Sequence, residues 1–122
     1  MVTAVLGASS DPDRYSAMAM SLLMEKGHVA IPVHPRETTI QGQKVWKSLN
    51  ELALAGQKID TVTVYVNAAL TTKMLSDFIQ LKPRRVIMNP GAENPVLEQG
   101  LKAQDIEVVH GCTLVMLRTG QY

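Results

Sequence analysis

The stretch of sequence that decides the fold runs from residue 2 to residue 33 and reads VTAVLGASSDPDRYSAMAMSLLMEKGHVAIPV. It opens with a short apolar, β-branched run at residues 2–6. A segment of helical period follows at about residues 14–26, with an apolar stripe suited to packing on a sheet and a glycine directly after it. Residues 28–33 form a second short apolar run. This order of strand, helix and strand predicts a βαβ unit with parallel strands.

The same alternation continues along the rest of the chain. Further strands are predicted at Thr61 to Val66, Arg85 to Met88 and Ile106 to Val109, and segments of helical period separate them. Crossover connections between parallel strands are right-handed, which limits the topologies that such a chain can adopt. The pattern therefore predicts an α/β fold, a Rossmann-like doubly wound, mostly parallel sheet of about five strands with helices on both faces.

Three local signals refine this picture. Pro32 has no amide hydrogen for a sheet, so we expect its strand to lie at an edge or to leave the sheet there. Residues 35–43 are predicted to be a loop, followed by a short edge strand at about residues 44–46. Asn67 is predicted to cap a helix that runs without interruption to Pro83.

Length and composition limit the class of protein. The 122 residues have the size of one domain, residues 1–122, and the net charge of +1 favours neither a nucleic-acid nor a membrane partner. The single cysteine, Cys112, excludes an intramolecular disulfide framework. The first residues show no basic, cleavable leader pattern. We expect a cytoplasmic domain, and leave open whether it forms a homodimer or binds an unknown protein partner.

In a doubly wound sheet the ligand crevice lies beyond the carboxyl ends of the strands, where the strand order reverses. Small or turn-forming residues follow most of the predicted strands, so the backbone can approach a ligand there. The helix that begins near Arg14 can present free amides to an anion. A phosphate-bearing ligand is one interpretation, and tight turns without a ligand are the other. The candidate residues are Gly7, Ala8, Ser9, Ser10, Arg14, Ser16, His34, Pro35, Arg36, Asn67, Ala68, Ala69, Asn89, Pro90 and Gly91.

The glycine fingerprint of dinucleotide-binding folds is absent from the first loop. Gly7 is its only glycine, and Ser9 and Pro12 stand where the second and third glycines would be. The second strand is followed by His-Pro-Arg and not by an acidic residue that would bind a ribose hydroxyl. Arg36 suits a phosphate on the adenosine ribose, because a guanidinium matches phosphate geometry, or it is a solvated loop charge. The pattern thus argues against a standard NAD site.

Five short pieces of the sequence resemble, in the same order, the motifs of a known family. They are Val5 to Ser9 with Arg14 and Ser16, Gly27 to Arg36, Gln41-Gly42 with Ser48-Leu49, Asp60 to Val66, and Gly91 to Glu93. On these pieces the chain resembles the small CoA-binding domain proteins and is similar to the N-terminal CoA-binding domain of the succinyl-CoA synthetase α subunit. The resemblance extends from about Val2 to Cys112.

This resemblance implies coenzyme A or an acyl-CoA as the ligand. It places Gly7, Ala8 and Ser9 along the diphosphate, with Arg14 and Arg36 near phosphates. It places the turn Asn67-Ala68-Ala69 against the adenine or the pantetheine, and Asn89 to Ala92 at the pantetheine end. The chain departs from the family at residues 66–69, which lack an Arg and a Glu, at His34 in place of Asn, and at Asn89 in place of Gln.

Three groups of side chains are candidates for a catalytic or metal-binding centre. His110 and Cys112 are two residues apart and would allow a thiolate nucleophile, although a lone cysteine is more often buried. The three histidines lack the spacing of metal ligands, and the acidic residues near the crevice suit helix starts better than acid–base chemistry. We therefore expect a non-catalytic CoA or acyl-CoA binding module. The alternatives are a small NADP-linked or other nucleotide-dependent enzyme, or a regulatory subunit with a vestigial pocket.

Overall fold

Five strands form one parallel sheet in a computed structural model that describes residues 1–122. They are β1 (Val2–Leu6), β2 (Val29–Val33), β5 (Thr61–Val64), β6 (Arg85–Met88) and β7 (Glu107–His110). Their order across the sheet is β2-β1-β5-β6-β7, and every neighbouring pair is parallel. The chain extends the sheet from β1 to one side and then, from β5, to the other. This order confirms the predicted doubly wound, Rossmann-like fold.

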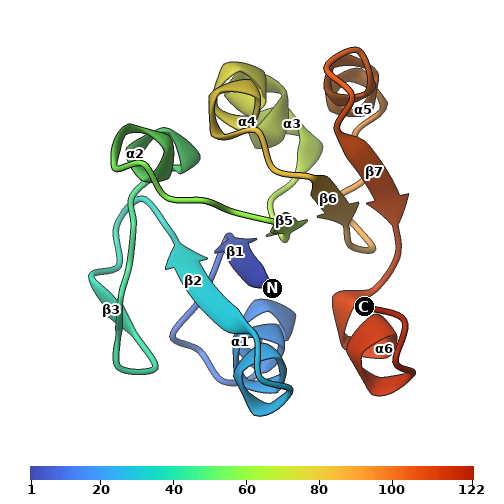
Figure 1. The fold of residues 1–122 in the computed structure, drawn as a ribbon. Helices are drawn as coiled ribbons and strands as arrows, with labels where there is room; N and C mark the ends of the chain where they lie inside the picture. The colour runs from blue at the N-terminus through green and yellow to red at the C-terminus, as the bar shows by residue number, and fades with distance from the viewer.

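Helices cover both faces of the sheet (Figure 1). One face carries α1 (Tyr15–Glu25) and α6 (Thr113–Arg118). The other carries α2 (Leu49–Leu54), α3 (Ala68–Thr71), α4 (Leu75–Leu81) and α5 (Pro95–Lys102). None of these helices has both the length and the apolar character needed to cross a membrane.

Each face of the sheet has its own hydrophobic core. Side chains alternate along a strand, so Ala4 and Leu6 of β1 belong to the larger core and Val5 between them belongs to the smaller one. Phe78 is a fully buried member of the larger core, and Met20 is one of the smaller. Strands buried on both faces have little room for exposed polar residues, which explains the short uninterrupted apolar runs in the sequence.

The edge beside β2 contains a hairpin that the sequence analysis did not predict. β2 is an edge strand, as Pro32 indicated, but residues 35–43 are not all loop. They include β3 (Thr39–Ile40), which pairs antiparallel with β4 (Gln43–Lys44). Gln41 and Gly42 join these strands with φ angles of 50° and 75°, the left-handed backbone that a tight hairpin turn requires. The predicted strand near residues 44–46 is reduced to β4 and one parallel bridge between Val33 and Trp46.

The predicted helix after Asn67 is interrupted. A short 3-10 segment, Thr72–Met74, separates α3 from α4. At this interruption the amide nitrogen of Asn94 donates to the Ala68 carbonyl at 3.2 Å and to the Thr72 hydroxyl at 2.9 Å. A side chain that arrives from a distant loop and bonds the backbone of a helix is a known cause of such irregularities.

Candidate functional site

The structure has a cleft at the carboxyl ends of the strands, the position expected for a ligand in a doubly wound sheet. β1 and β5 are neighbours, and the connections from them run to opposite sides, so the crevice between their carboxyl ends is the switch point of the sheet. A cleft of about 780 Å³ opens there. It is lined by the loops after β1, β2, β5 and β6 and by the beginnings of α1 and α2.

Most of the predicted site residues line this cleft. Those that do are Gly7, Ala8, Ser9, Arg14, Ser16, His34, Pro35, Arg36, Asn67, Pro90 and Gly91. They come from five separate segments of the chain, and the fold brings these segments together.

Four predicted residues do not line the cleft. Ser10 is exposed and bonds to Glu37, and Ala68 and Ala69 lie in the first turn of α3. Asn89 is 2% exposed and holds buried structure together. Its amide nitrogen donates to the Thr63 hydroxyl at 2.7 Å, and its oxygen accepts from the Thr113 amide at 2.8 Å. These bonds connect β5 and β6 to the start of α6, so Asn89 stabilises the fold and does not line the cleft.

About half of the residues that line the cleft were not predicted from the sequence. The missed residues share no sequence signal, because they reach the cleft from strand ends, helix starts, loops and helix interiors alike. They are Leu6, Tyr15, Val33, Lys47, Ser48, Leu49, Tyr65, Val66, Leu70, Met74 and Asp77. Leu49, Leu70 and Met74 give one part of the cleft an apolar wall. Leu49 begins α2, Leu70 lies in α3 and Met74 ends the 3-10 segment, so only the position of these elements beside the cleft could have identified them.

The backbone at the end of β1 is bent so that it closely approaches its neighbours. Gly7 has a φ angle of +87°, and a Cβ atom added there would lie 2.8 Å from the Val66 side chain. The amides of Gly7 and Ala8 both donate to the Val33 carbonyl, at 3.0 and 3.2 Å. This arrangement fixes the first loop against the end of β2 and leaves the floor of the cleft free of side chains at residue 7.

The first turn of α1 faces the cleft without a side-chain cap. Ser48, Asn67 and Asn94 cap α2, α3 and α5, whereas α1 has Arg14 at the capping position and no side-chain hydrogen bond there. The amides of Tyr15 and Ser16 consequently have no partner within the protein, and both residues line the cleft. Free amides and the positive end of the helix dipole together favour an anion.

Positive charge predominates in the cleft lining. Arg14, Arg36 and Lys47 line it, against one carboxylate, Asp77, and none of the four takes part in an ion pair. Cations that are left without acidic partners on the wall of a concave site attract anionic ligands.

Tyr65, His110 and Cys112 are side chains with acid–base or nucleophilic potential, but their arrangement does not favour catalysis. Burial raises the pKa of Tyr65 to about 12, so its hydroxyl keeps its proton at neutral pH. His110 and Cys112 do not line the cleft, and His110 Nε2 lies 2.7 Å from a Glu98 carboxylate oxygen. No group of three or more His, Cys, Asp or Glu side chains gathers anywhere in the chain.

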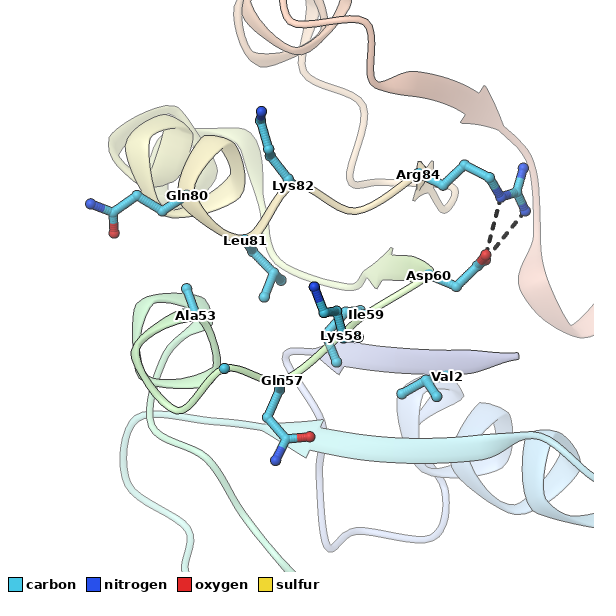
Figure 2. A pocket seen from close by; sticks show the side chains of 11 residues that line it. Val2, Ala53, Gln57, Lys58, Ile59, Asp60, Gln80, Leu81, Lys82 and Arg84 are labelled. Carbon is cyan, nitrogen blue, oxygen red and sulfur yellow. Dashed lines mark hydrogen bonds and ion pairs between the residues drawn. The ribbon is translucent and has the colours of Figure 1, made fainter.

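A second cavity, of about 620 Å³, lies at the opposite end of the sheet. Figure 2 shows it between the end of α2, the end of α4 and the residues that lead into β5 and β6. Its one carboxylate, Asp60, accepts two hydrogen bonds from the Arg84 guanidinium. Nε donates to Oδ2 at 3.1 Å and Nη2 donates to Oδ1 at 3.2 Å. This cavity lies at the amino ends of the strands and away from the switch point, so the cleft at the carboxyl ends is the candidate site.

Comparison with known proteins identifies the family of the chain. The sequence pattern of the CoA binding domain family matches residues 2–118. The chain belongs to this family. A crystal structure of an uncharacterized protein is similar to this CoA-binding domain with 37% identity and a TM-score of 0.88, over 99% of this chain and 97% of that one.

Two further structures are similar to the CoA-binding domain. Cell-free ID.343 from Thermus thermophilus is 28% identical with a TM-score of 0.89, over 99% of this chain and 90% of that one. The dinucleotide forming acetyl-coenzyme A synthetase 1 of Ca. Korarchaeum cryptofilum is 19% identical with a TM-score of 0.72. That match covers 88% of this chain but 25% of the synthetase, and at this identity it shows a shared fold only.

Proposed function

We propose that this protein binds coenzyme A or an acyl-CoA in the switch-point cleft and does not itself transform it. The observation that carries the proposal is the set of three unpaired cations, Arg14, Arg36 and Lys47, on the wall of that cleft. Coenzyme A carries a diphosphate and a separate ribose phosphate, so it needs several positive groups spread along its length. Membership of the CoA-binding domain family supports the same ligand.

The local structure of the cleft fits such a ligand. The unpartnered amides of Tyr15 and Ser16 are donors suited to the diphosphate, and the absence of a side chain at Gly7 allows close approach. The apolar wall at Leu70 and Met74 suits the uncharged parts of the molecule. The volume of about 780 Å³ is in the range of cofactor sites, which is about 300–1,000 Å³.

A binding role without chemistry is supported by how the polar side chains of the cleft are used. The Ser9 hydroxyl accepts a hydrogen bond from the Asp11 amide at 3.0 Å, and the Ser48 hydroxyl accepts one from the Glu51 amide at 3.1 Å. No serine is hydrogen-bonded to a histidine, which a serine nucleophile would need for activation. When bound, coenzyme A supplies a thiol or a thioester, and this chain's residues would hold and orient it.

We also propose that the module works in the cytoplasm as a carrier or sensor, without nucleic-acid or membrane partners. The net charge of +1 supports the absence of nucleic-acid and membrane partners, because it provides no general attraction to either surface. A homodimer or another protein partner stays a prediction.

The proposal is tested by calorimetric titration of the protein with CoA, acetyl-CoA, NADP and ATP. We expect dissociation constants in the micromolar range for CoA and acetyl-CoA, which correspond to a binding free energy of about −8 kcal/mol. NADP and ATP should bind weakly. Tight binding of NADP with weak CoA binding would instead support the nucleotide-dependent enzyme. No binding of any of the four would support the regulatory subunit with a vestigial pocket.

A second titration tests which phosphate of the ligand Arg36 binds. If its guanidinium binds the ribose 3′-phosphate, Arg36→Ala should weaken the affinity for CoA about tenfold. The affinity for dephospho-CoA should stay nearly unchanged, because that ligand lacks the phosphate. Arg118→Ala is the matched control, since Arg118 is exposed on α6 and does not line the cleft. Equal weakening of both ligands by Arg36→Ala would place this contact on another phosphate.

A further inference from the structure

The side chain of His34 closes the turn that follows β2. Its Nδ1 accepts hydrogen bonds from the amides of Arg36 and Glu37, both at 3.1 Å. Neither amide has a backbone acceptor, so the imidazole alone satisfies them. Because both partners are N–H donors, Nδ1 must carry a lone pair and the ring proton resides on Nε2.

The turn held by His34 is also joined to the first loop of the cleft. The carboxylate of Glu37 accepts from the Ser10 amide at 3.2 Å and from the Ser10 hydroxyl. On the other side, the His34 amide donates to the Trp46 carbonyl at 2.9 Å. Residues 34–37, which the imidazole holds in a turn, therefore connect the loop after β1 with the segment before α2.

We propose that His34 is a positioning residue for the ligand, acting through Arg36. By fixing residues 34–37 through Nδ1, it holds the Arg36 guanidinium at the cleft and keeps the two anion-facing loops joined through Glu37. This inference rests on the proposed function, since Arg36 is taken as a phosphate contact.

The expected effect of losing Nδ1 follows from the exposure of this turn. Arg36 is exposed, and its side chain makes no hydrogen bond within the protein, so nothing else holds it at the cleft wall. Without an acceptor at residue 34, the two amides would bond to water and the turn would sample many conformations. Binding would then have to order the turn again, which weakens the affinity by about tenfold.

Three variants at residue 34 separate the role of Nδ1 from that of ring bulk. In His34→Asn the amide oxygen is attached to Cγ, as Nδ1 is, so it can accept the same two bonds, as asparagine does in turns. We expect His34→Asn to retain the CoA affinity to within about twofold. His34→Ala has no acceptor and His34→Gln places it one bond farther out, so both should lose about tenfold. His110→Ala is the control, because that histidine is the last residue of β7 and lies outside the cleft.

A double-mutant cycle tests whether His34 acts through Arg36. In the Arg36→Ala background, His34→Ala should cause little further loss, because the group it positions is already gone. If the two losses instead multiply, or if asparagine fails to restore affinity, His34 acts on the ligand directly or only through its bulk, and the proposal is wrong.

A measurement without ligand distinguishes this proposal from the proposed function. Hydrogen exchange of the Arg36 and Glu37 amides should be slow in the wild type and in His34→Asn, and fast in His34→Ala. Nitrogen-15 spectra of the imidazole should show the Nε2–H tautomer. Fast exchange in the wild type, or an Nδ1–H tautomer, would overturn the positioning role whether or not CoA binds. Slow exchange in a protein that does not bind CoA would refute the proposed function alone.

Discussion

Gly7 is the residue on which the shape of the cleft depends most directly. Its φ angle of +87° is unfavourable for any residue with a side chain, and an added Cβ would lie 2.8 Å from Val66 Cγ2 and 3.3 Å from the Tyr65 carbonyl carbon. We expect Gly7→Ala to lower the free energy of unfolding by about 2–4 kcal/mol, from backbone strain together with overpacking. The same change should weaken CoA binding, because the strand ends on both sides of the cleft must move apart.

Gly27→Ala separates the two causes. Gly27 has a φ angle of +86° but nothing within 4 Å of the added atom, so this variant should show the backbone cost alone, about 1–2 kcal/mol. Urea unfolding of both variants measures the difference. Equal losses would mean that the contact with Val66 is relieved at no cost and does not shape the cleft.

Residues of the site were predictable where a side chain directly follows a strand. The position of Gly7, Ser9 and Arg36 after β1 and β2 is a local property. The strand order then brings these loops together at the cleft. Asn89 also follows a strand, yet its side chain turns inward because the Thr63 hydroxyl and the Thr113 amide need a partner there. That demand comes from residues 26 and 24 positions away, so no local pattern reveals it.

At the scale of elements, α6 depends on Asn89. This helix has six residues and no side-chain cap of its own at Cys112, so it has little intrinsic stability. The bond from the Thr113 amide to Asn89 fixes its first turn to the sheet. Asn89→Ala would leave buried polar groups without partners, and we expect it to lower the free energy of unfolding by about 3 kcal/mol and to speed hydrogen exchange in α6.

Asn67→Ala is the matched control for this element. Asn67 also follows a strand, but it is exposed and caps α3 by accepting from the Leu70 amide at 3.1 Å. Its loss should lower the free energy of unfolding by about 1 kcal/mol and leave exchange in α6 unchanged. If the two variants destabilise equally, Asn89 is an ordinary surface cap and α6 is held by its apolar contacts.

Elements were predictable from sequence where one local signal determines them. The strands of the sheet and the cap at Asn67 belong to this class, since an apolar run or a capping residue is sufficient. The β3–β4 hairpin was missed because its strands have two residues each, too short for any periodicity. The break between α3 and α4 was missed because Asn94, the side chain bonded there, comes from a later loop.

For the whole molecule, the titratable groups at the amino ends of the strands predict how stability depends on pH. Burial, the N-terminal ammonium and Arg85 all lower the pKa of His28. The hydrogen bond from Arg84 lowers the pKa of Asp60, on the same end of the sheet. In both cases the unfolded chain takes up a proton more readily than the native protein, so acid destabilises the fold.

The two groups should act in separate pH ranges. The unfolded histidine titrates near pH 6.5, so the free energy of unfolding should fall as the pH drops through about 6.5 and level off below the native pKa of His28. Asp60 stabilises the fold above about pH 4, and this contribution is lost as the pH falls further through its native pKa. Urea unfolding from pH 8 to pH 3 measures both steps. His28→Asn does not titrate, so it should abolish the first step and retain the second, while His34 and His110 remain in both proteins. Parallel curves for the wild type and His28→Asn between pH 8 and pH 5 would show that the acid sensitivity originates elsewhere in the molecule.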